Sequence, residues 1–299
     1  MDQEMPGWRF QATRDRLSQA IYKEIAEGRG TRNGGVYLDI THLPLATIRK
    51  EYEIGNYYKK LLSIGVDISQ RPIETKVSAH FFMGGARVNE RGETNIPGLF
   101  AGGEAVSGYH GANRLGGNAL SEILVSGSRA GQYAATWAGS HRGQVERQWV
   151  DARLRGWEQK ILEWQGRKSG LRPILGKRKI QELMWESAGV VREGKKMEKG
   201  LALLGNLKEE TETQMAVTPG KQFNREILDA FELTHMIQIS TLILRAAWAR
   251  RESRGAHYRL DFPFPDNKEW LANIILQKSG EDVSLRTEKV FFTRMVPEE

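Results

Sequence analysis

Apolar residues recur at helical spacing through the first and last parts of the chain, and glycine turns interrupt the pattern between them. Leu17, Ile21 and Ile25 repeat every four residues, as on the buried face of an amphipathic helix. Thr13 precedes this repeat and is a residue type that favours an N-cap. The first part of the chain therefore predicts a helix over 13–27, a strand over 35–40 and a second helix over 45–62.

The middle of the chain predicts short strands separated by glycine turns. Strand-like runs are expected at 76–82, 86–92 and 99–101, the last of them buried. Asn118 is expected to cap a helix that continues to about Trp137, with Leu120 and Leu124 on one face.

From about residue 140 the pattern changes to long helices. Apolar residues between Val150 and Trp164 are spaced by four, three, four and three residues, which is typical of an amphipathic helix. A weaker pattern follows at 180–191, and a third and a fourth helical pattern follow at 197–207 and 224–251. These lengths predict a three- or four-helix bundle with its tryptophans in the core, followed by a tail with a strand at 289–292.

Composition excludes several kinds of site. The 299 residues include no cysteine, so the chain can hold no disulfide, thiolate metal site or cysteine-ligated iron–sulfur cluster. The net charge is +7, but lysine and arginine are scattered, which favours a solvated basic surface over nucleic-acid binding. The first residues do not have the pattern of a signal peptide, and the apolar runs fall short of the roughly 20 residues of a membrane span.

Two glycine-dense turns each carry one ionisable side chain. His80 begins the run His-Phe-Phe-Met-Gly-Gly, and Arg114 lies within Gly-Ala-Asn-Arg-Leu-Gly-Gly-Asn at 111–118. Glycine lets a backbone approach a large flat ligand and leaves its N–H donors unobstructed. A guanidinium matches a carboxylate with two parallel hydrogen bonds, and an imidazole can donate to another. The two turns therefore suit a dianionic substrate, although either side chain alone could have a structural role.

Five blocks in this order resemble the flavoprotein subunit of the succinate dehydrogenase and fumarate reductase family, which also includes L-aspartate oxidase. Any one block would be weak, but five in order are specific. The blocks are Thr13-Arg14-Asp15 with the helix that follows it, 80–85, 102–104, 110–118 and 253–263. The resemblance implies an α+β, multidomain fold. Its parts would be the C-terminal part of a capping domain at 1–74, the last segment of an FAD-binding α/β domain at 75–138, a helical bundle domain at 139–252 and a C-terminal tail at 253–299.

The resemblance also implies roles for individual residues. Arg14 would exchange the catalytic proton, and His80 and Arg114 would hold the substrate carboxylates. His110 would lie near the flavin or substrate, or else orient its turn, while the tail residues His257 and Arg259 would be structural. The residues implied in FAD contact are Gly103, Glu104, Asn118, Ala119 and Leu120.

The implied activity is the interconversion of fumarate and succinate, with FAD as cofactor and with electrons exchanged through an iron–sulfur subunit. The protein would be cytoplasmic, or peripheral at the cytoplasmic face of the membrane through partner subunits. Family members begin with a strand, a glycine turn and a helix that hold the ADP part of FAD, and no Gly-x-Gly-x-x-Gly of this kind occurs near the start of this chain. We therefore expect an N-terminal half to be missing, supplied in cis or as a separate chain. The alternatives are an L-aspartate oxidase-type enzyme or an inactive fragment.

Overall fold

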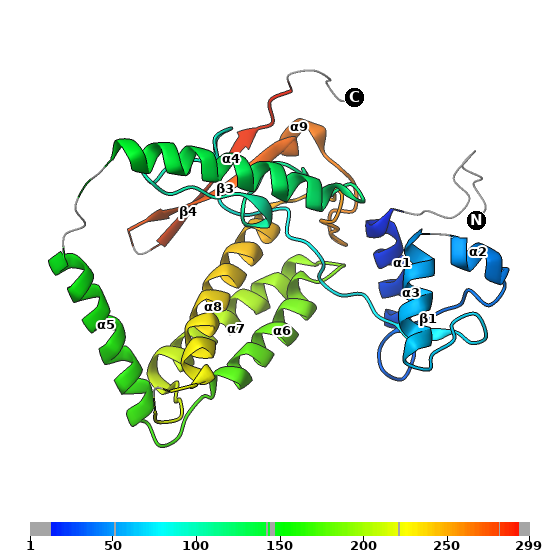
Figure 1. Ribbon diagram of the computed structural model, residues 1–299, viewed down its shortest axis with the longest axis horizontal. Coiled ribbons are helices and arrows are strands. Elements are labelled where there is room, and N and C mark those ends of the chain that lie inside the picture. Colours follow the sequence, from blue (N-terminus) through cyan, green and yellow to red (C-terminus); the bar gives the residue numbers. More distant parts are fainter. Residues whose placement is uncertain are drawn as a thin grey trace. The chain divides into compact units, whose positions relative to one another are not determined.

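The computed structural model describes residues 13–50, 52–141, 143, 147–220, 222–280 and 282–292. Contacts divide the chain into two compact units, with the boundary between Phe81 and Phe82 (Figure 1). Helices predominate in both units, and strands occur only as short pairs among the described residues. The four-part division of the chain suggested by the family resemblance stays a prediction.

The first unit contains a pair of short strands and three helices. Its elements are α1 (Arg14–Ala26), β1 (Val36–Leu38), α2 (Leu45–Lys50), α3 (Tyr52–Ser63) and β2 (Ile73–Thr75). The two strands are antiparallel, with Tyr37 opposite Glu74. A small core of Ile40, Ile48, Tyr58 and Ile68 holds the unit together.

The helix expected over 13–27 is confirmed as α1, with Thr13 at its N-cap position. Within the described part of the chain, however, the Thr13 side chain makes no capping hydrogen bond. The single helix expected over 45–62 is instead two helices, α2 and α3, and Glu51 between them lies outside the described residues. The strand expected over 35–40 is confirmed in its central part, as β1.

The second unit begins with an irregular segment that leads into α4 (Asn118–Ser140). The expectation of strands at 76–82, 86–92 and 99–101 was wrong. Among these described residues, 76–82 form no strand pairing, and the two later segments form only isolated bridges, Ala86 with Val106 and Phe100 with Glu93. Turns bend the chain every few residues, with Gly92 and Gly98 both at positive φ, so no ladder can lengthen. Leu99 is also 49% exposed rather than buried.

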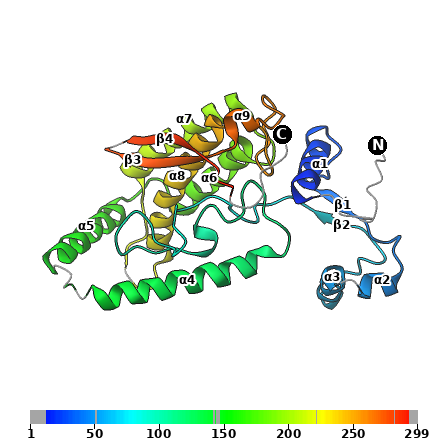
Figure 2. The ribbon, with the colours of Figure 1, turned by 90° about the horizontal axis from the view of Figure 1, so that it is seen from above.

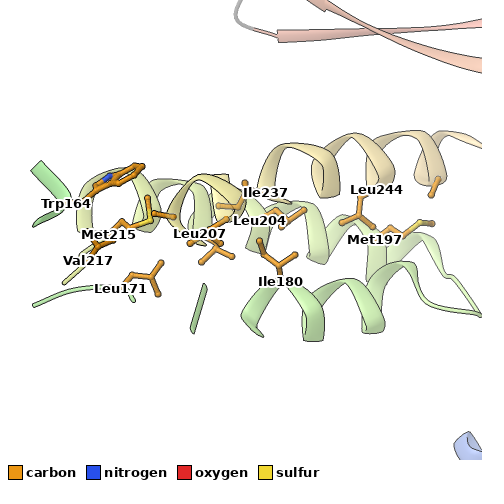
Figure 3. Packing of buried hydrophobic residues seen from close by; sticks show 13 residues of the cluster. Trp164, Leu171, Ile180, Met197, Leu204, Leu207, Met215, Val217, Ile237 and Leu244 are labelled. Carbon is orange, nitrogen blue, oxygen red and sulfur yellow. The ribbon is translucent and has the colours of Figure 1, made fainter. Parts of the chain in front are cut away.

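The bundle consists of α5 (Arg147–Gly166), α6 (Pro173–Ala188), α7 (Gly194–Gln214) and α8 (Arg225–Ala249). Helix α8 packs against both α6 and α7, and the three lie side by side in Figures 1 and 2. Figure 3 shows the apolar side chains that fill the space between them. The buried members of this core are Trp164, Leu171, Ile180, Met197, Leu204, Leu207, Met215, Val217, Ala230, Leu233, Ile237, Leu244 and Ala247.

The bundle expected from the sequence is confirmed in its helices, but the tryptophans differ in burial. Trp164 is 2% exposed, and it meets Phe231 edge to face with ring centroids 5.1 Å apart. Trp149 and Leu154, nearer the start of α5, are more than half exposed. The expectation that the bundle's tryptophans lie in the core was therefore wrong for Trp149, because only the C-terminal end of α5 packs into the core.

Helix α8 is long and apolar enough to cross a membrane by length and composition alone. Its side chains nevertheless serve the bundle. Leu233 and Leu244 are fully buried, and Asp229 accepts a hydrogen bond of 2.8 Å from Lys177 on α6. These contacts are those of the core helix of a bundle.

The tail contains α9 (Asn267–Trp270) and an antiparallel hairpin of β3 (Ala272–Ser279) and β4 (Asp282–Lys289). The hairpin lies by α8, where Arg245 donates to Asp282 at 2.9 Å (Figure 2). The strand expected at 289–292 was wrong beyond Lys289, where β4 ends. Lys289 lies opposite Ala272, the first residue of β3, so β3 offers no partner for the residues that follow.

Candidate functional site

Arg114 lies in a loop at residues 107–117, called the Arg114 loop below. Two backbone contacts and one side-chain contact fix this loop within the second unit. At the start of the loop, Ser107 donates its backbone N–H to Ala86 at 3.0 Å. At its centre, the carbonyl of Ala112 accepts from the backbone N–H of Ala256, also at 3.0 Å. The Arg114 side chain is half-buried, and its Nη1 donates to the carbonyl of Leu115 at 3.3 Å. The loop therefore presents its guanidinium from a supported backbone.

The third contact is a buried imidazole–carboxylate contact between the loop and α4. Nε2 of His110 lies 3.4 Å from the Oε2 atom of Glu122, and the two side chains are 5% and 8% exposed. Glu122 lies four residues after Asn118, so it belongs to the first turns of α4. The pair thus ties the start of the Arg114 loop to the helix that follows it, which supports the orienting role considered for His110.

The N-terminus of α4 is open. Gly117 has a φ of +78° and occupies the N-cap position, without a side-chain cap from the described residues. The expectation that Asn118 caps this helix was wrong, because the left-handed conformation at the cap favours glycine, and Asn118 is the first helical residue. A Cβ added at Gly116 or Gly117 would have no described atom within 4 Å. The first N–H groups of α4, including those of Ala119 and Leu120, thus begin at an unobstructed turn.

Gly103 and Glu104 each form a hydrogen bond with another segment of the second unit. Gly103 donates its N–H to Ser126 Oγ on α4 at 2.7 Å and has a φ of +70°. Glu104 is exposed, and its Oε1 accepts from the backbone N–H of Phe82 at 2.8 Å. One carboxylate oxygen of Glu104 therefore holds the run at 80–85 that begins with His80, at its third residue.

Arg14 and His80 belong to the first unit. Arg14 is the first residue of α1, and His80 lies in an extended segment after β2. Both side chains are exposed, as a role in contacting a ligand requires. The structure thus brings the Arg114 loop, Gly103, Glu104 and the start of α4 together in one unit, while the convergence of His80 and Arg114 stays a prediction.

The loop at 253–262, which contacts the Arg114 loop, is built around a buried arginine. Arg259 is 2% exposed and donates from Nη1 to the carbonyls of Ala247, Trp248 and Arg250 at 3.0–3.1 Å. It also pairs with Asp261 at 2.6 Å. Its positive charge therefore lies at the C-terminal end of α8, where the helix dipole favours a cation.

His257 in the same loop pairs with an arginine that sequence reasoning missed. Nη1 of Arg192 lies 2.7 Å from Nδ1 of His257. A guanidinium can only donate, so this imidazole nitrogen accepts and the ring is neutral. Burial, and then the charge of Arg192, lower the pKa of His257 to about 3. Burial also lowers the pKa of Arg192, to about 10.

Neutral His257 predicts a loss of stability on mild acidification. Between about pH 6.5 and pH 5 the unfolded chain takes up a proton at this residue that the folded chain refuses, since the folded pKa is lowered to about 3. The free energy of unfolding should therefore fall with decreasing pH, by up to about 1.4 kcal/mol per unit from this group. Urea unfolding at pH 6.5 and 5 tests this, and His257→Gln should flatten the dependence. Equal slopes for the two chains would contradict it.

Glu122 and Arg192 show what the sequence did not reveal. A carboxylate in the second turn of a helix carries no signal of its own in the sequence, and only the fold shows that Glu122 faces His110. Arg192 and His257 are 65 residues apart, and no motif links them. The expectation of structural roles for His257 and Arg259 agrees with their contacts in the tail.

Two family models match the chain, and together they cover most of it. The model described as "FAD binding domain" matches residues 7–120, and "Fumarate reductase flavoprotein C-term" matches 177–299. The chain is 42% identical over 271 residues to a fumarate reductase (CoM/CoB) protein of Methanothermobacter marburgensis, covering 90% of this chain and 48% of the relative. It is 34% identical over 256 residues to the fumarate reductase flavoprotein subunit of Escherichia coli, covering 83% and 42%.

Solved structures of similar fold lead to the same family as the sequence comparisons. The FrdA chain of Escherichia coli quinol fumarate reductase superimposes with a TM-score of 0.84 at 31% identity, over 96% of this chain and 50% of that one. The chain belongs to the succinate dehydrogenase and fumarate reductase flavoprotein family. The Mycobacterium smegmatis Sdh1 complex in the apo form gives 0.81 at 30% identity, over 98% and 50%. The chain spans about half the length of the curated relatives it matches.

The family membership expected from the five sequence blocks is therefore confirmed. The fold agrees with that of the flavoprotein subunit, with many helices and few strands. FAD is the cofactor implied by the family.

Proposed function

We propose that this chain supplies the substrate-binding side of an FAD-dependent flavoprotein that interconverts fumarate and succinate. The observation that carries the proposal is the Arg114 loop, which is held by backbone contacts and by the buried His110–Glu122 contact beside an open helix N-terminus. A guanidinium on a fixed loop is suited to bind one carboxylate in a fixed orientation. The names of the Methanothermobacter marburgensis and Escherichia coli relatives favour fumarate over an amino-dicarboxylate substrate.

The residues around α4 fit the flavin end of FAD. Gly116 and Gly117 leave the approach to the helix N-terminus open, as a flat ring requires. The N–H groups of Ala119 and Leu120 and the positive end of the helix dipole would bind the electron-rich pyrimidine edge. The N–H of Asn118 donates instead to the carbonyl of Leu115 at 3.3 Å. Gly103 provides close backbone, and the remaining oxygen of Glu104 would accept from a ribityl or ribose hydroxyl. FAD, when bound, supplies the hydride that is exchanged with one substrate carbon.

The chain's own residues would bind the substrate and handle the proton. Arg114 and His80 would each hold a carboxylate, and together they would turn one of them out of conjugation with the double bond. That twist favours hydride addition at the neighbouring carbon. Arg14 would deliver a proton to the other carbon during reduction and would take it back during oxidation. Because a free guanidinium keeps its proton far above neutral pH, Arg14 must be reloaded by a relay.

The electron partner would be an iron–sulfur subunit, as the family resemblance implies. The assembled flavoprotein would act in the cytoplasm, or at the cytoplasmic face of a membrane through its partners.

Replacing Arg14 with alanine should slow fumarate reduction by about 100-fold or more, the usual contribution of a positioned proton donor. The KM for fumarate should change little, because the carboxylates are held elsewhere. Steady-state kinetics of the flavoprotein that contains this chain, with a reduced viologen dye as donor, measure both parameters. Arg16→Ala is the matched control, since Arg16 is also an exposed arginine in the first turn of α1. Equal rates for the two variants would remove Arg14 from the mechanism.

The proposed activity is tested with the same flavoprotein. We expect flavin absorption bands in the purified protein and dye oxidation that depends on fumarate. A colourless protein that does not bind FAD, or a flavoprotein that reduces no dicarboxylate, would contradict the proposal.

A further inference from the structure

The Arg114 loop and the loop at 253–262 approach each other so closely that position 255 has no room for a side chain. Gly255 has a φ of +56°, and a Cβ at this position would lie 2.4 Å from the carbonyl oxygen of Ala112 and 2.9 Å from Cβ of Asn113. The next residue, Ala256, donates its N–H to the same carbonyl at 3.0 Å. Ala112 and Asn113 immediately precede Arg114, so the contact lies at the base of the arginine.

The loop at 253–262 is itself firmly anchored. Ser253 Oγ accepts from the backbone N–H of Arg259 at 2.8 Å and donates to the carbonyl of Phe262 at 2.7 Å. Arg254 and His257 exchange backbone hydrogen bonds of 2.8 and 3.0 Å across the turn that contains Gly255. Arg259 fixes the loop to the end of α8. A displacement at the contact would therefore fall on the Arg114 loop rather than on its support.

We infer that Gly255 is a positioning residue, which holds the Arg114 loop against the anchored tail and so sets the place of the guanidinium. The inference rests on the proposed function, because it gives Arg114 its substrate-binding role. A methyl group at this position must push Ala112 away by several tenths of an ångström or more, since real Cβ atoms do not approach an oxygen to 2.4 Å. A displacement of about 1 Å at a positioning group can lower a rate by about 100-fold.

The decisive variant is Gly255→Ala, with Gly280→Ala as its control. Gly280 also has a positive φ, of +62°, so alanine is strained there too, but an added Cβ would have no described atom within 4 Å. The pair therefore separates the cost of backbone conformation from the loss of the close contact. Hydrogen–deuterium exchange of the full chain is followed in peptides that cover 107–117 and in peptides from α6 to α8.

We expect Gly255→Ala to speed exchange in residues 107–117 by about 10-fold or more while the bundle helices keep their protection. Gly280→Ala should leave both regions unchanged. Unchanged exchange at 107–117 in Gly255→Ala would overturn the inference. If that variant fails to fold, hydrogen exchange at the Ala256 amide of the unaltered chain is the test. The contact requires this amide to be protected from exchange, because it donates to the carbonyl of Ala112. Fast exchange there would overturn the inference equally.

Kinetics of the flavoprotein that contains this chain complete the test. Gly255→Ala should lower kcat/KM for fumarate by about 100-fold at unchanged flavin content, whereas Gly280→Ala should not. If Gly255→Ala speeds exchange at 107–117 but the unaltered flavoprotein does not reduce fumarate, the proposed function is contradicted while the contact stands. Full activity of Gly255→Ala in an enzyme that does reduce fumarate would overturn the positioning role itself.

Discussion

Replacing Arg114 with alanine is expected to lower kcat/KM for fumarate by about three orders of magnitude in the flavoprotein that contains this chain. The reason is that a carboxylate loses two charge-assisted hydrogen bonds, and the charge that develops on the substrate during reduction loses its counterion. Flavin should stay bound, because the proposed cofactor contacts come from Gly103, Glu104 and the start of α4. Steady-state kinetics, normalised to flavin absorbance, measure the effect.

Two further variants sharpen this result. Arg114→Lys keeps the charge but cannot form the bidentate pair, so its activity should lie between those of the alanine variant and the unaltered enzyme. Arg178→Ala removes an exposed arginine from α6 and should leave the kinetics unchanged. Unchanged dicarboxylate kinetics in Arg114→Ala would refute the role of Arg114 as a carboxylate clamp.

Replacing Arg259 with alanine should lower the free energy of unfolding of the second unit by about 3–5 kcal/mol. The buried guanidinium donates to three carbonyls at the end of α8 and pairs with Asp261. Its removal leaves these buried and part-buried carbonyls without their donor. Urea unfolding of the chain, followed by tryptophan fluorescence, measures the change, since the tryptophans of α5, α6, α8 and α9 all report on this unit.

Arg251→Ala is the control for this measurement, because Arg251 is an exposed arginine just after the same helix. It should change the free energy of unfolding by no more than about 0.5 kcal/mol. A loss below about 1 kcal/mol in Arg259→Ala would show that the buried network is not a main support of the tail.

The sequence predicted helices well where an apolar stripe is continuous. Helix α8 was expected over 224–251 and found at Arg225–Ala249, because its inward positions repeat at helical spacing from Ala230 to Ala247. Asn224 accepts from the N–H of Glu226 and so marks its start. The short strands were not predictable in the same way, because a strand needs a partner elsewhere in the chain, and turns at Gly92 and Gly98 prevent such pairing.

The sequence was enough to predict which residues belong to the candidate site, but not the tertiary contacts that hold them in place. Glycine turns around single charged side chains singled out His80 and Arg114 from the sequence alone. The contacts that hold the Arg114 loop join distant parts of the chain, as between Gly255 and Ala112, and leave no periodic signal. Local patterns reveal which side chain can do the chemistry, whereas tertiary contacts decide how firmly it is held.

The guanidinium of Arg114 and the imidazole of His80 are expected to meet on one four-carbon dianion. A crystal structure of the flavoprotein that contains this chain, with FAD and fumarate bound, tests this most directly. We predict one substrate carboxylate within hydrogen-bond distance of the Arg114 guanidinium and the other within hydrogen-bond distance of the His80 imidazole. A dicarboxylate bound elsewhere, with Arg114 and His80 facing unrelated surfaces, would contradict the account.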